Sequence, residues 1–180
     1  GPRHGGANIK VKHMMDELLA NIKDLTDEEE IADYLGKIIT KDAGDGSGLI
    51  YGFGHAIYTL SDPRAKILKK NAKKLSAEKG MTDIYEFYKR VEKLVPSVFE
   101  NVKGSKKVIC ANVDFYSGFV YDMLGIESDL FTPLFAVSRI AGWCAHRIEE
   151  ITYGGRIIRP AYRSMVKPTG YVPLDERTAD

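Results

Sequence analysis

Cysteine is scarce in this sequence: Cys110 and Cys144 are its two examples among 180 residues. Two thiols are too few for a disulfide framework, so we expect a reducing, cytoplasmic location. No Cys/His spacing resembles a zinc site, so we expect no metal. Apolar runs are also short, and none approaches the roughly 18 residues that a membrane-spanning helix needs. These absences exclude a disulfide-rich secreted module and predict no membrane partner.

The sequence has no excess of charge of one sign. Lys and Arg number 26 and Asp and Glu number 25, which gives a formal net charge of +1. This balance provides no basic field for a nucleic acid or an anionic membrane, so we expect neither partner. The apolar share of 44% and the charged share of 28% are those of an ordinary globular protein.

The start of the chain has none of the features of a signal peptide. It opens at Gly1 without Met, and neither a basic region nor an apolar region follows. We therefore expect the chain to be a piece of a longer protein.

Helical periodicity covers most of the chain, because apolar residues recur at intervals of three and four. The predicted helices run from Gly6 or Asn8 to Ile22, from a capping box at Thr26 through Ile39, from Asp62 to Gly80, from Thr82 to beyond Val95, from Asn112 to Gly125, and from Thr132 to Gly154. Pro96 should bend or restart the fourth helix. The predicted fold class is therefore mostly α.

The remaining segments are expected to be irregular. The glycine run 44–48 predicts a loop, and prolines break any helix in the tail from 156 to 180. Strand content should be limited to short pieces near 49–51 or 156–158. On the third predicted helix, Ile67, Leu68 and Leu75 should face inward, and its lysines should form a solvated face.

Two histidines stand among glycines. His4 precedes a helix start, where free backbone N–H groups disfavour the imidazolium, so a neutral His4 could donate a hydrogen bond to a carbonyl. A capping histidine is the alternative. His55 ends the sequence Gly52-Phe53-Gly54-His55, in which glycines let the backbone approach a ligand. Arg64 stands near a helix start and indicates an anion site, or else a surface arginine.

A carboxylate and a second arginine interrupt apolar helices. Asp114 lies between apolar neighbours at a helix start, so desolvation would raise its pKa and helix N–H groups would lower it. It is a candidate base, or else a plain N-cap. Arg139 lies within the most apolar helix, and a buried arginine needs an anion. An internal salt bridge or a side chain that reaches solvent is the alternative.

Taken in order, these motifs resemble the C-terminal half of the citrate synthase family, from residue 1 to about 162. The motifs are Gly1-Pro2-x-His4-Gly5-Gly6-Ala7-Asn8, Gly52–His55, Asp62–Ala65, Asn112-Val113-Asp114-x-x-Ser117-Gly118, Phe131–Gly142 and Arg159-Pro160. The resemblance implies an acyltransferase of the tricarboxylic acid cycle, which condenses acetyl-CoA with oxaloacetate and hydrolyses citryl-CoA to citrate. It implies acetyl-CoA as a co-substrate and no permanently bound cofactor.

The resemblance also implies roles for the candidate residues. Asp114 would remove a methyl proton from acetyl-CoA, His4 would stabilise the enol, and His55 would polarise the oxaloacetate carbonyl. The residues that would bind oxaloacetate are His55, Arg64, Arg139 and Arg159, with Arg159 reaching the other subunit of a homodimer. The residues that would contact CoA are Tyr51, Gly52, Phe53, Gly54, Lys107 and Asn112. Thr59 stands where the family has a further CoA-binding arginine, so that contact is absent or differently supplied.

The resemblance divides the chain into three parts. Residues 1–6 would end a large-domain segment that carries the catalytic His4, 7–125 would form a helical small domain, and 126–180 would return to the large domain as a helix and tail. The family segment before these motifs lies outside this sequence, so we expect the chain alone to be inactive. One alternative is a 2-methylcitrate synthase, because one methylene of propionyl-CoA is worth only about 1–3 kcal/mol of discrimination. Another is a non-catalytic helical assembly module.

Overall fold

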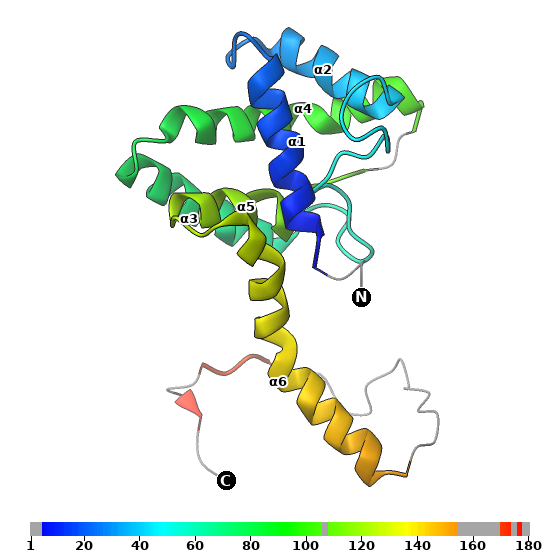
Figure 1. Cartoon of the computed structure of the whole chain (residues 1–180), viewed down its shortest axis with the longest axis vertical. Coiled ribbons are helices and arrows are strands. Elements are labelled where there is room, and N and C mark those ends of the chain that lie inside the picture. Colours follow the sequence, from blue (N-terminus) through cyan, green and yellow to red (C-terminus); the bar gives the residue numbers. More distant parts are fainter. Residues whose placement is uncertain (1–4, 106–107, 155–169, 174–175, 178–180) are drawn as a thin grey trace. The chain divides into compact units, whose positions relative to one another are not determined.

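Helices make up most of the computed structural model, which describes residues 5–105, 108–154, 170–173 and 176–177 (Figure 1). The described elements are α1 (Ala7–Asn21), α2 (Glu28–Thr40), α3 (Pro63–Glu78), α4 (Thr82–Lys103), α5 (Val113–Met123), the short 3₁₀ helix η1 (Ser128–Leu130) and α6 (Phe131–Thr152). An isolated antiparallel bridge pairs Phe53 with Ala111. The prediction of a mostly α fold is confirmed.

The chain forms two compact units, residues 1–140 and 141–180. The first unit contains α1 to α5 and the first half of α6, and its core is built around α5. Phe115, Tyr116 and Phe119 of this helix are buried, and the Phe119 ring stacks on Tyr88 of α4 at 4.7 Å between centroids. Helices α1 and α3 both pack against α5. The helix that begins with Val113 and Asp114 is therefore held on several sides.

The capping residues at the starts of α3 and α5 are those that the sequence predicts. The Asp62 carboxylate caps α3 by accepting from the Arg64 amide, and Pro63 takes the first helical position. The side chain of Asn112 caps α5 in the same way. The cap predicted at Thr26 is wrong. The Asp24 carboxylate accepts from both the amide and the hydroxyl of Thr26, and Asp27 caps α2 instead.

The interior of α4 departs from the prediction. The helix is continuous from Thr82 to Lys103, so of the two predicted effects of Pro96, a bend or a restart, the restart is absent. The ring at Pro96 removes one backbone hydrogen bond from the helix. Val95 and Val98, on either side of it, are buried in the core and hold both halves of the helix in place.

The inward face of α3 also differs from the prediction. Ile67 is 66% exposed, and Ala65 and Ala72 are buried instead. Leu68 and Leu75 are partly buried against the core, as predicted. Small residues face α5 because the two helices pack closely there, and periodicity alone does not reveal the size of the residue that a neighbour admits. None of the described helices is long and apolar enough to cross a bilayer.

Candidate active site

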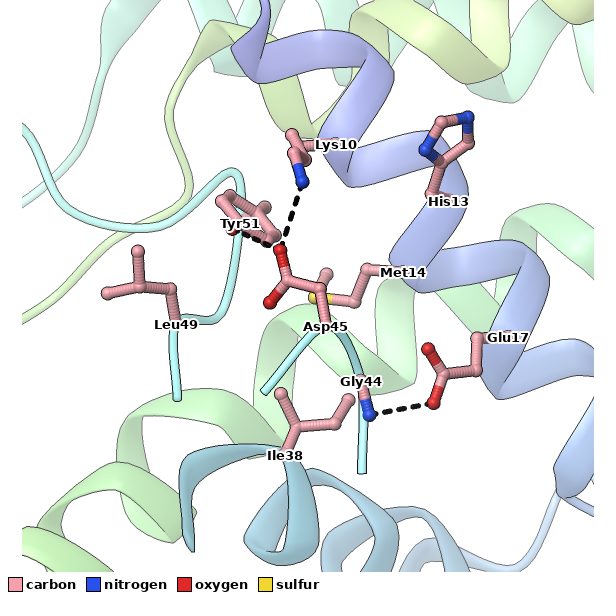
Figure 2. A pocket seen from close by; sticks show the side chains of 9 residues that line it. All are labelled: Lys10, His13, Met14, Glu17, Ile38, Gly44, Asp45, Leu49 and Tyr51. Atoms are coloured by element: carbon pink, nitrogen blue, oxygen red, sulfur yellow. Dashed lines mark hydrogen bonds and ion pairs between the residues drawn. The ribbon is translucent and has the colours of Figure 1, made fainter. Parts of the chain in front are cut away.

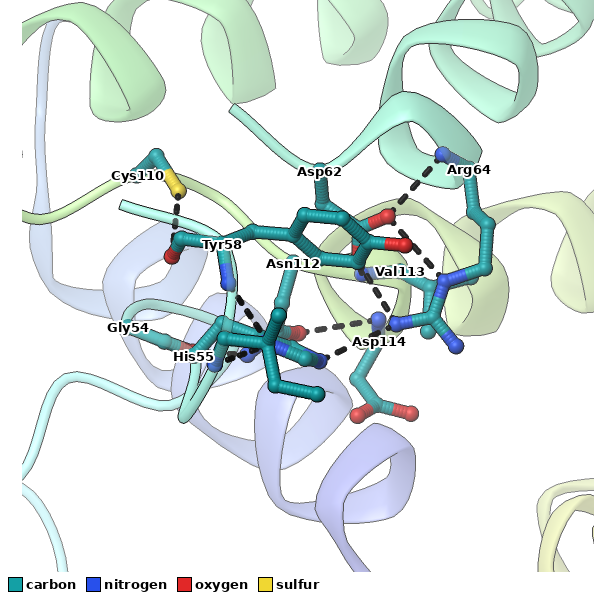
Figure 3. Close-up of polar contacts among 10 residues, drawn as sticks. Gly54, His55, Tyr58, Asp62, Arg64, Cys110, Asn112, Val113 and Asp114 are labelled. Carbon is teal, nitrogen blue, oxygen red and sulfur yellow. Dashed lines mark hydrogen bonds and ion pairs between the residues drawn. The ribbon is translucent and has the colours of Figure 1, made fainter. Parts of the chain in front are cut away.

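A glycine loop and the start of α5 are tied together by backbone hydrogen bonds. The Asn112 amide donates to the Gly52 carbonyl and the Gly54 amide donates to the Cys110 carbonyl, each at 2.8 Å. The Asn112 side-chain Nδ2 also donates to the Gly54 carbonyl at 2.9 Å. Gly52 and Gly54 both have φ of +83°, a conformation that favours glycine. The loop 51–55 therefore places His55 near Asp114 (Figure 3).

His55 is held in one orientation by its own loop. Its Nδ1 accepts the amides of Ile57 and Tyr58 at 3.0 and 3.1 Å. Because Nδ1 is an acceptor, a neutral ring carries its proton on Nε2. Nε2 lies 3.2 Å from a guanidinium nitrogen of Arg64, which can only donate. In this tautomer His55 Nε2 and the Arg64 nitrogen are both hydrogen-bond donors. Two donors side by side suit an oxygen-rich anion.

Arg64 is oriented by a buried carboxylate. Asp62 Oδ1 accepts from Nε of Arg64 at 3.0 Å, and Oδ2 accepts from its NH2 at 2.9 Å. Oδ2 also accepts the Val113 amide at 3.2 Å, so one carboxylate joins the starts of α3 and α5. The Asp62 side chain is fully inaccessible, whereas half of the Arg64 side chain is exposed. The hydrogen bonds from Arg64 hold the pKa of Asp62 below its usual value.

Two contacts of the Asp62 carboxylate were not predicted from the sequence. The sequence identified it only as a helix cap, and its bonds to the Arg64 guanidinium and to Val113 were missed. The Asp-Pro-Arg spacing was the available signal, because a capping carboxylate lies within reach of the side chain two residues on. The contact with Val113 joins residues 51 positions apart and had no local signal.

Replacing Asp62 with asparagine should lower the free energy of unfolding by about 1–3 kcal/mol at pH 7, because a charge-assisted acceptor is lost. Since the pKa of Asp62 is lowered on folding, its contribution is complete above the unfolded value of about 3.9 and is lost as the pH falls through the folded value. The difference from wild type should therefore shrink in acid. Urea denaturation at a series of pH values measures it.

Asp27→Asn is the matched control, because Asp27 also caps a helix through two amides but is hydrogen-bonded to no cation within the described part of the chain. Asparagine caps as well as aspartate, so this change should be close to neutral. If Asp62→Asn and Asp27→Asn lowered the free energy of unfolding equally, the contact between Asp62 and Arg64 would contribute nothing to stability.

Asp114 lies in the first turn of α5 and is half-buried. Burial is the largest influence on its pKa and raises it, whereas the charges of Arg64 and Arg139 lower it. The net shift is upward, so burial prevails. In Figure 3 its carboxylate lies on the same side of the site as the Arg64 guanidinium. A carboxylate with a raised pKa beside cationic side chains is a suitable general base, because a higher pKa makes it a stronger proton acceptor.

Arg139 folds back on its own helix. Its guanidinium donates to the Phe135 carbonyl and the Ser138 hydroxyl, both at 2.7 Å, and lies 3.2 Å from the centroid of the Phe135 ring. All three contacts are with neutral groups, and no ion pair to Arg139 occurs within the described residues. Within the part of the chain that the structure describes, Arg139 therefore has neither an anionic hydrogen-bond partner nor a salt bridge. Its charge nevertheless influences Asp114.

Three predicted site residues, His4, Lys107 and Arg159, lie outside the described residues. The residue after His4 is described. Gly5 has φ of +70°, and its carbonyl accepts the Thr132 hydroxyl at 3.2 Å. The chain next to His4 is thus attached to the first turn of α6.

Comparison with known proteins tests the resemblance. The family profile "Citrate synthase, C-terminal domain" matches residues 1–161. The chain belongs to the citrate synthase family. Its relatives include a citrate synthase of Synechocystis, 40% identical over 178 residues, which are 98% of this chain and 40% of that protein. Another is a 2-methylcitrate synthase of Shewanella oneidensis, 37% identical over 98% of this chain and 42% of its own.

A solved citrate synthase supports the fold. The ternary complex of carboxymethyl coenzyme A and oxaloacetate with citrate synthase from Thermoplasma acidophilum is 36% identical to this chain, with a TM-score of 0.64. The match covers 98% of this chain and 43% of that one. The chain therefore spans about two fifths of the length of these citrate synthases.

Proposed function

We propose that the protein containing this chain condenses acetyl-CoA with oxaloacetate and hydrolyses the resulting citryl-CoA to citrate and CoA. The observation that carries the proposal is the grouping of His55, Arg64 and Asp114 at the starts of α3 and α5, in a chain of the citrate synthase family. The chain alone is inactive under this proposal, because a site of this family needs segments beyond the part that the chain matches.

The chemistry needs a base and an electrophile together. A thioester methyl group is a very weak acid, so a carboxylate requires hydrogen-bond donation to the thioester oxygen. We assign the base to Asp114 and the donor to His4. Asp114 removes a methyl proton, and the enol that forms is stabilised by His4. The raised pKa of Asp114 makes it a stronger base than an exposed aspartate.

His55 activates the second substrate. Its Nε2–H donates to the ketone oxygen of oxaloacetate and transfers the proton as the carbon–carbon bond forms. Two backbone amides occupy Nδ1, so the donor position cannot switch to the other nitrogen. Arg64 and Arg139 bind the carboxylates of oxaloacetate, with Arg159 supplied by the other subunit of a homodimer. Arg139 suits this role because the two groups that accept its hydrogen bonds within the described residues are neutral, so they do not cancel its charge.

The CoA subsite is assigned to the loop 51–54 together with Lys107 and Asn112. Both ends of the Asn112 side-chain amide are already occupied, by the Gly54 carbonyl and by the Asp114 amide. Asn112 therefore serves this subsite by holding the loop in place. We also propose that residues 7–125 form the small domain, that 1–6 and 126–180 belong to the large domain, and that the enzyme works in the cytoplasm.

The proposal is tested with the full-length protein, acetyl-CoA and oxaloacetate, by following thiol release and citrate formation. Propionyl-CoA is assayed in parallel, because the Shewanella relative is a 2-methylcitrate synthase. Higher kcat/KM with acetyl-CoA supports citrate synthesis. Calorimetric titration with oxaloacetate and CoA separates both enzymes from a non-catalytic assembly module, which should bind neither.

Replacing Arg139 with leucine should raise the KM for oxaloacetate about tenfold or more, because a charge-assisted hydrogen bond is worth roughly 1.5–3 kcal/mol. The KM for acetyl-CoA should stay within about twofold, since such a change removes one contact with one substrate. Steady-state kinetics with each substrate varied in turn measures both values.

Arg147→Leu is the control on the same helix. Arg147 is exposed and forms an ion pair with Glu150 at 2.6 Å, so its loss should leave both KM values unchanged. If Arg139→Leu raised both KM values equally, the assignment of Arg139 to the dicarboxylate would be wrong.

A further inference from the structure

The glycine run 44–48 carries a cluster of polar contacts that the proposed reaction does not use. Asp45 Oδ2 accepts from Lys10 Nζ at 3.0 Å and from the Tyr51 hydroxyl at 2.6 Å. Asp45 Oδ1 accepts the Ser47 amide at 3.1 Å. The Ser47 hydroxyl also lies 3.3 Å from the Tyr51 hydroxyl. We call Lys10, Asp45 and Tyr51 the Asp45 clamp; Figure 2 shows it from close by.

The loop that carries the clamp is itself anchored to α1. The Gly44 amide donates to Glu17 at 2.8 Å, and Glu17 also accepts the Tyr34 hydroxyl at 2.9 Å. Gly44, Gly46 and Gly48 all have φ between +71° and +75°, so the loop turns back on itself instead of extending away. The Asp45 carboxylate, with donors from Ser47, Tyr51 and Lys10, has a pKa well below the usual value and is ionised throughout the neutral range.

The clamp connects two segments that lead into the proposed site. Lys10 is in the first turn of α1, six positions after His4, and Tyr51 directly precedes Gly52. The Lys10 ammonium lies 5.6 Å from the centroid of the Tyr51 ring, so the ring is held by its hydroxyl and by its face. The cavity beside the clamp has about 70 Å³, far below the roughly 300–1,000 Å³ of a ligand site. It holds water at most, so the clamp is not a second binding site.

We propose that Asp45 is a positioning residue for the acyl-CoA subsite: by fixing Tyr51 against α1, it sets the conformation of the loop 51–54. This inference rests on the proposed function, because that loop is the segment we assign to CoA. A carboxylate at this position accepts hydrogen bonds from a cation and a phenol at once, and its negative charge strengthens both bonds.

The kinetic test uses the full-length protein. Asp45→Ala should raise the KM for acetyl-CoA about tenfold, with kcat and the KM for oxaloacetate within about twofold, because residues 51–54 are disturbed whereas His55 stays held by the amides of Ile57 and Tyr58. Asp45→Asn keeps an acceptor for the Tyr51 hydroxyl and should give a smaller rise, about threefold. In a Tyr51→Phe background, Asp45→Ala should add little, since Asp45 acts through Tyr51. Glu28→Gln, which breaks a similarly exposed ion pair with Lys93, is the matched control and should change nothing.

Hydrogen exchange without substrate separates this proposal from the proposed function. The Gly54 amide is hydrogen-bonded in the wild type, and Asp45→Ala should speed exchange in peptides covering 49–55 but not in α4. Faster exchange in a protein that makes no citrate would support the clamp and reject the proposed function. An active wild type in which Asp45→Ala changes neither the KM for acetyl-CoA nor loop exchange would overturn the clamp. Equal rises in both KM values, or fully additive effects of the Asp45 and Tyr51 changes, would also overturn it.

Discussion

Replacing Asp114 with asparagine in the full-length protein should lower kcat about a thousandfold, because a positioned general base contributes typically 10²–10⁴-fold. The KM for oxaloacetate should change little, since Arg64 and Arg139 remain. Asparagine has nearly the same shape but cannot accept a proton from the acetyl methyl group. The measurement is the steady-state rate of citrate formation with both substrates saturating.

The stability of this variant distinguishes a lost base from a damaged fold. Burial raises the pKa of Asp114, so the folded protein holds its ionised form less favourably than the unfolded chain does. Stability from this group therefore falls as the pH rises through the interval between the unfolded and the folded pKa. At pH 7 Asp114→Asn should unfold at the same temperature as the wild type or at a higher one.

Asp122→Asn is the control from the other end of α5. Asp122 forms an ion pair with Lys12 at 3.0 Å and takes no part in the proposed chemistry. The kcat of Asp122→Asn should therefore stay within about twofold of wild type. The wild-type kcat/KM for acetyl-CoA should also decline on the acid side as Asp114 takes up a proton, at a pH above the ordinary aspartate value. Near-normal kcat in Asp114→Asn would refute the assignment of the base.

The second large effect concerns the glycine loop. Gly52→Ala should lower the free energy of unfolding by about 2–4 kcal/mol, the sum of a left-handed backbone conformation and overpacking. An added Cβ would lie 2.9 Å from the Cα and Cβ of Phe115 and from Cγ2 of Val11. The Phe115 Cα is backbone at the start of α5, so the strain cannot be relieved by a rotamer change. Chemical denaturation measures the loss.

Gly54→Ala provides an internal comparison. Gly54 has the same φ of +83°, but no atom lies within 4 Å of the added Cβ. Gly54→Ala should therefore lower the free energy of unfolding by only about 1–2 kcal/mol, which is the cost of the left-handed backbone conformation alone. Equal losses at the two glycines would show that the close approach between the loop and α5 is absent. Gly52→Ala should also weaken oxaloacetate binding, because moving the loop moves His55.

Local rules predicted the parts of the site that depend on neighbouring residues. Asp62 and Asn112 were identified as helix starts because a cap acts over two or three positions. Burial was correctly named as raising the pKa of Asp114, but the influences that lower it are the charges of Arg64 and Arg139 and not the helix N–H groups that the sequence suggested. Ile67 was placed on the wrong face, because its exposure depends on where α5 lies.

Contacts between distant segments could not be predicted. The Asp45 clamp joins Lys10 to a residue 35 positions away, in a run that the sequence marked only as a loop. Pro96 was expected to bend or restart α4; no restart occurs, because burial of the residues around it outweighs one lost hydrogen bond. At Pro96 tertiary packing outweighs a local preference of about 3 kcal/mol, whereas the wrong cap at Thr26 reflects a competing local cap at Asp27.

The bond between Asn112 and Gly54 spans 58 positions, and this separation has a kinetic consequence. Closing so long a loop is entropically unfavourable until α3 and α4, which lie between the two residues, have formed and docked. We therefore expect the site to assemble late in folding and, under the proposed function, partly folded chains to bind no substrate. Because oxaloacetate would bind only the completely folded protein, a concentration of about one hundred times its Kd would raise the free energy of unfolding by about 2.7 kcal/mol. Substrate would then slow unfolding more than it speeds refolding.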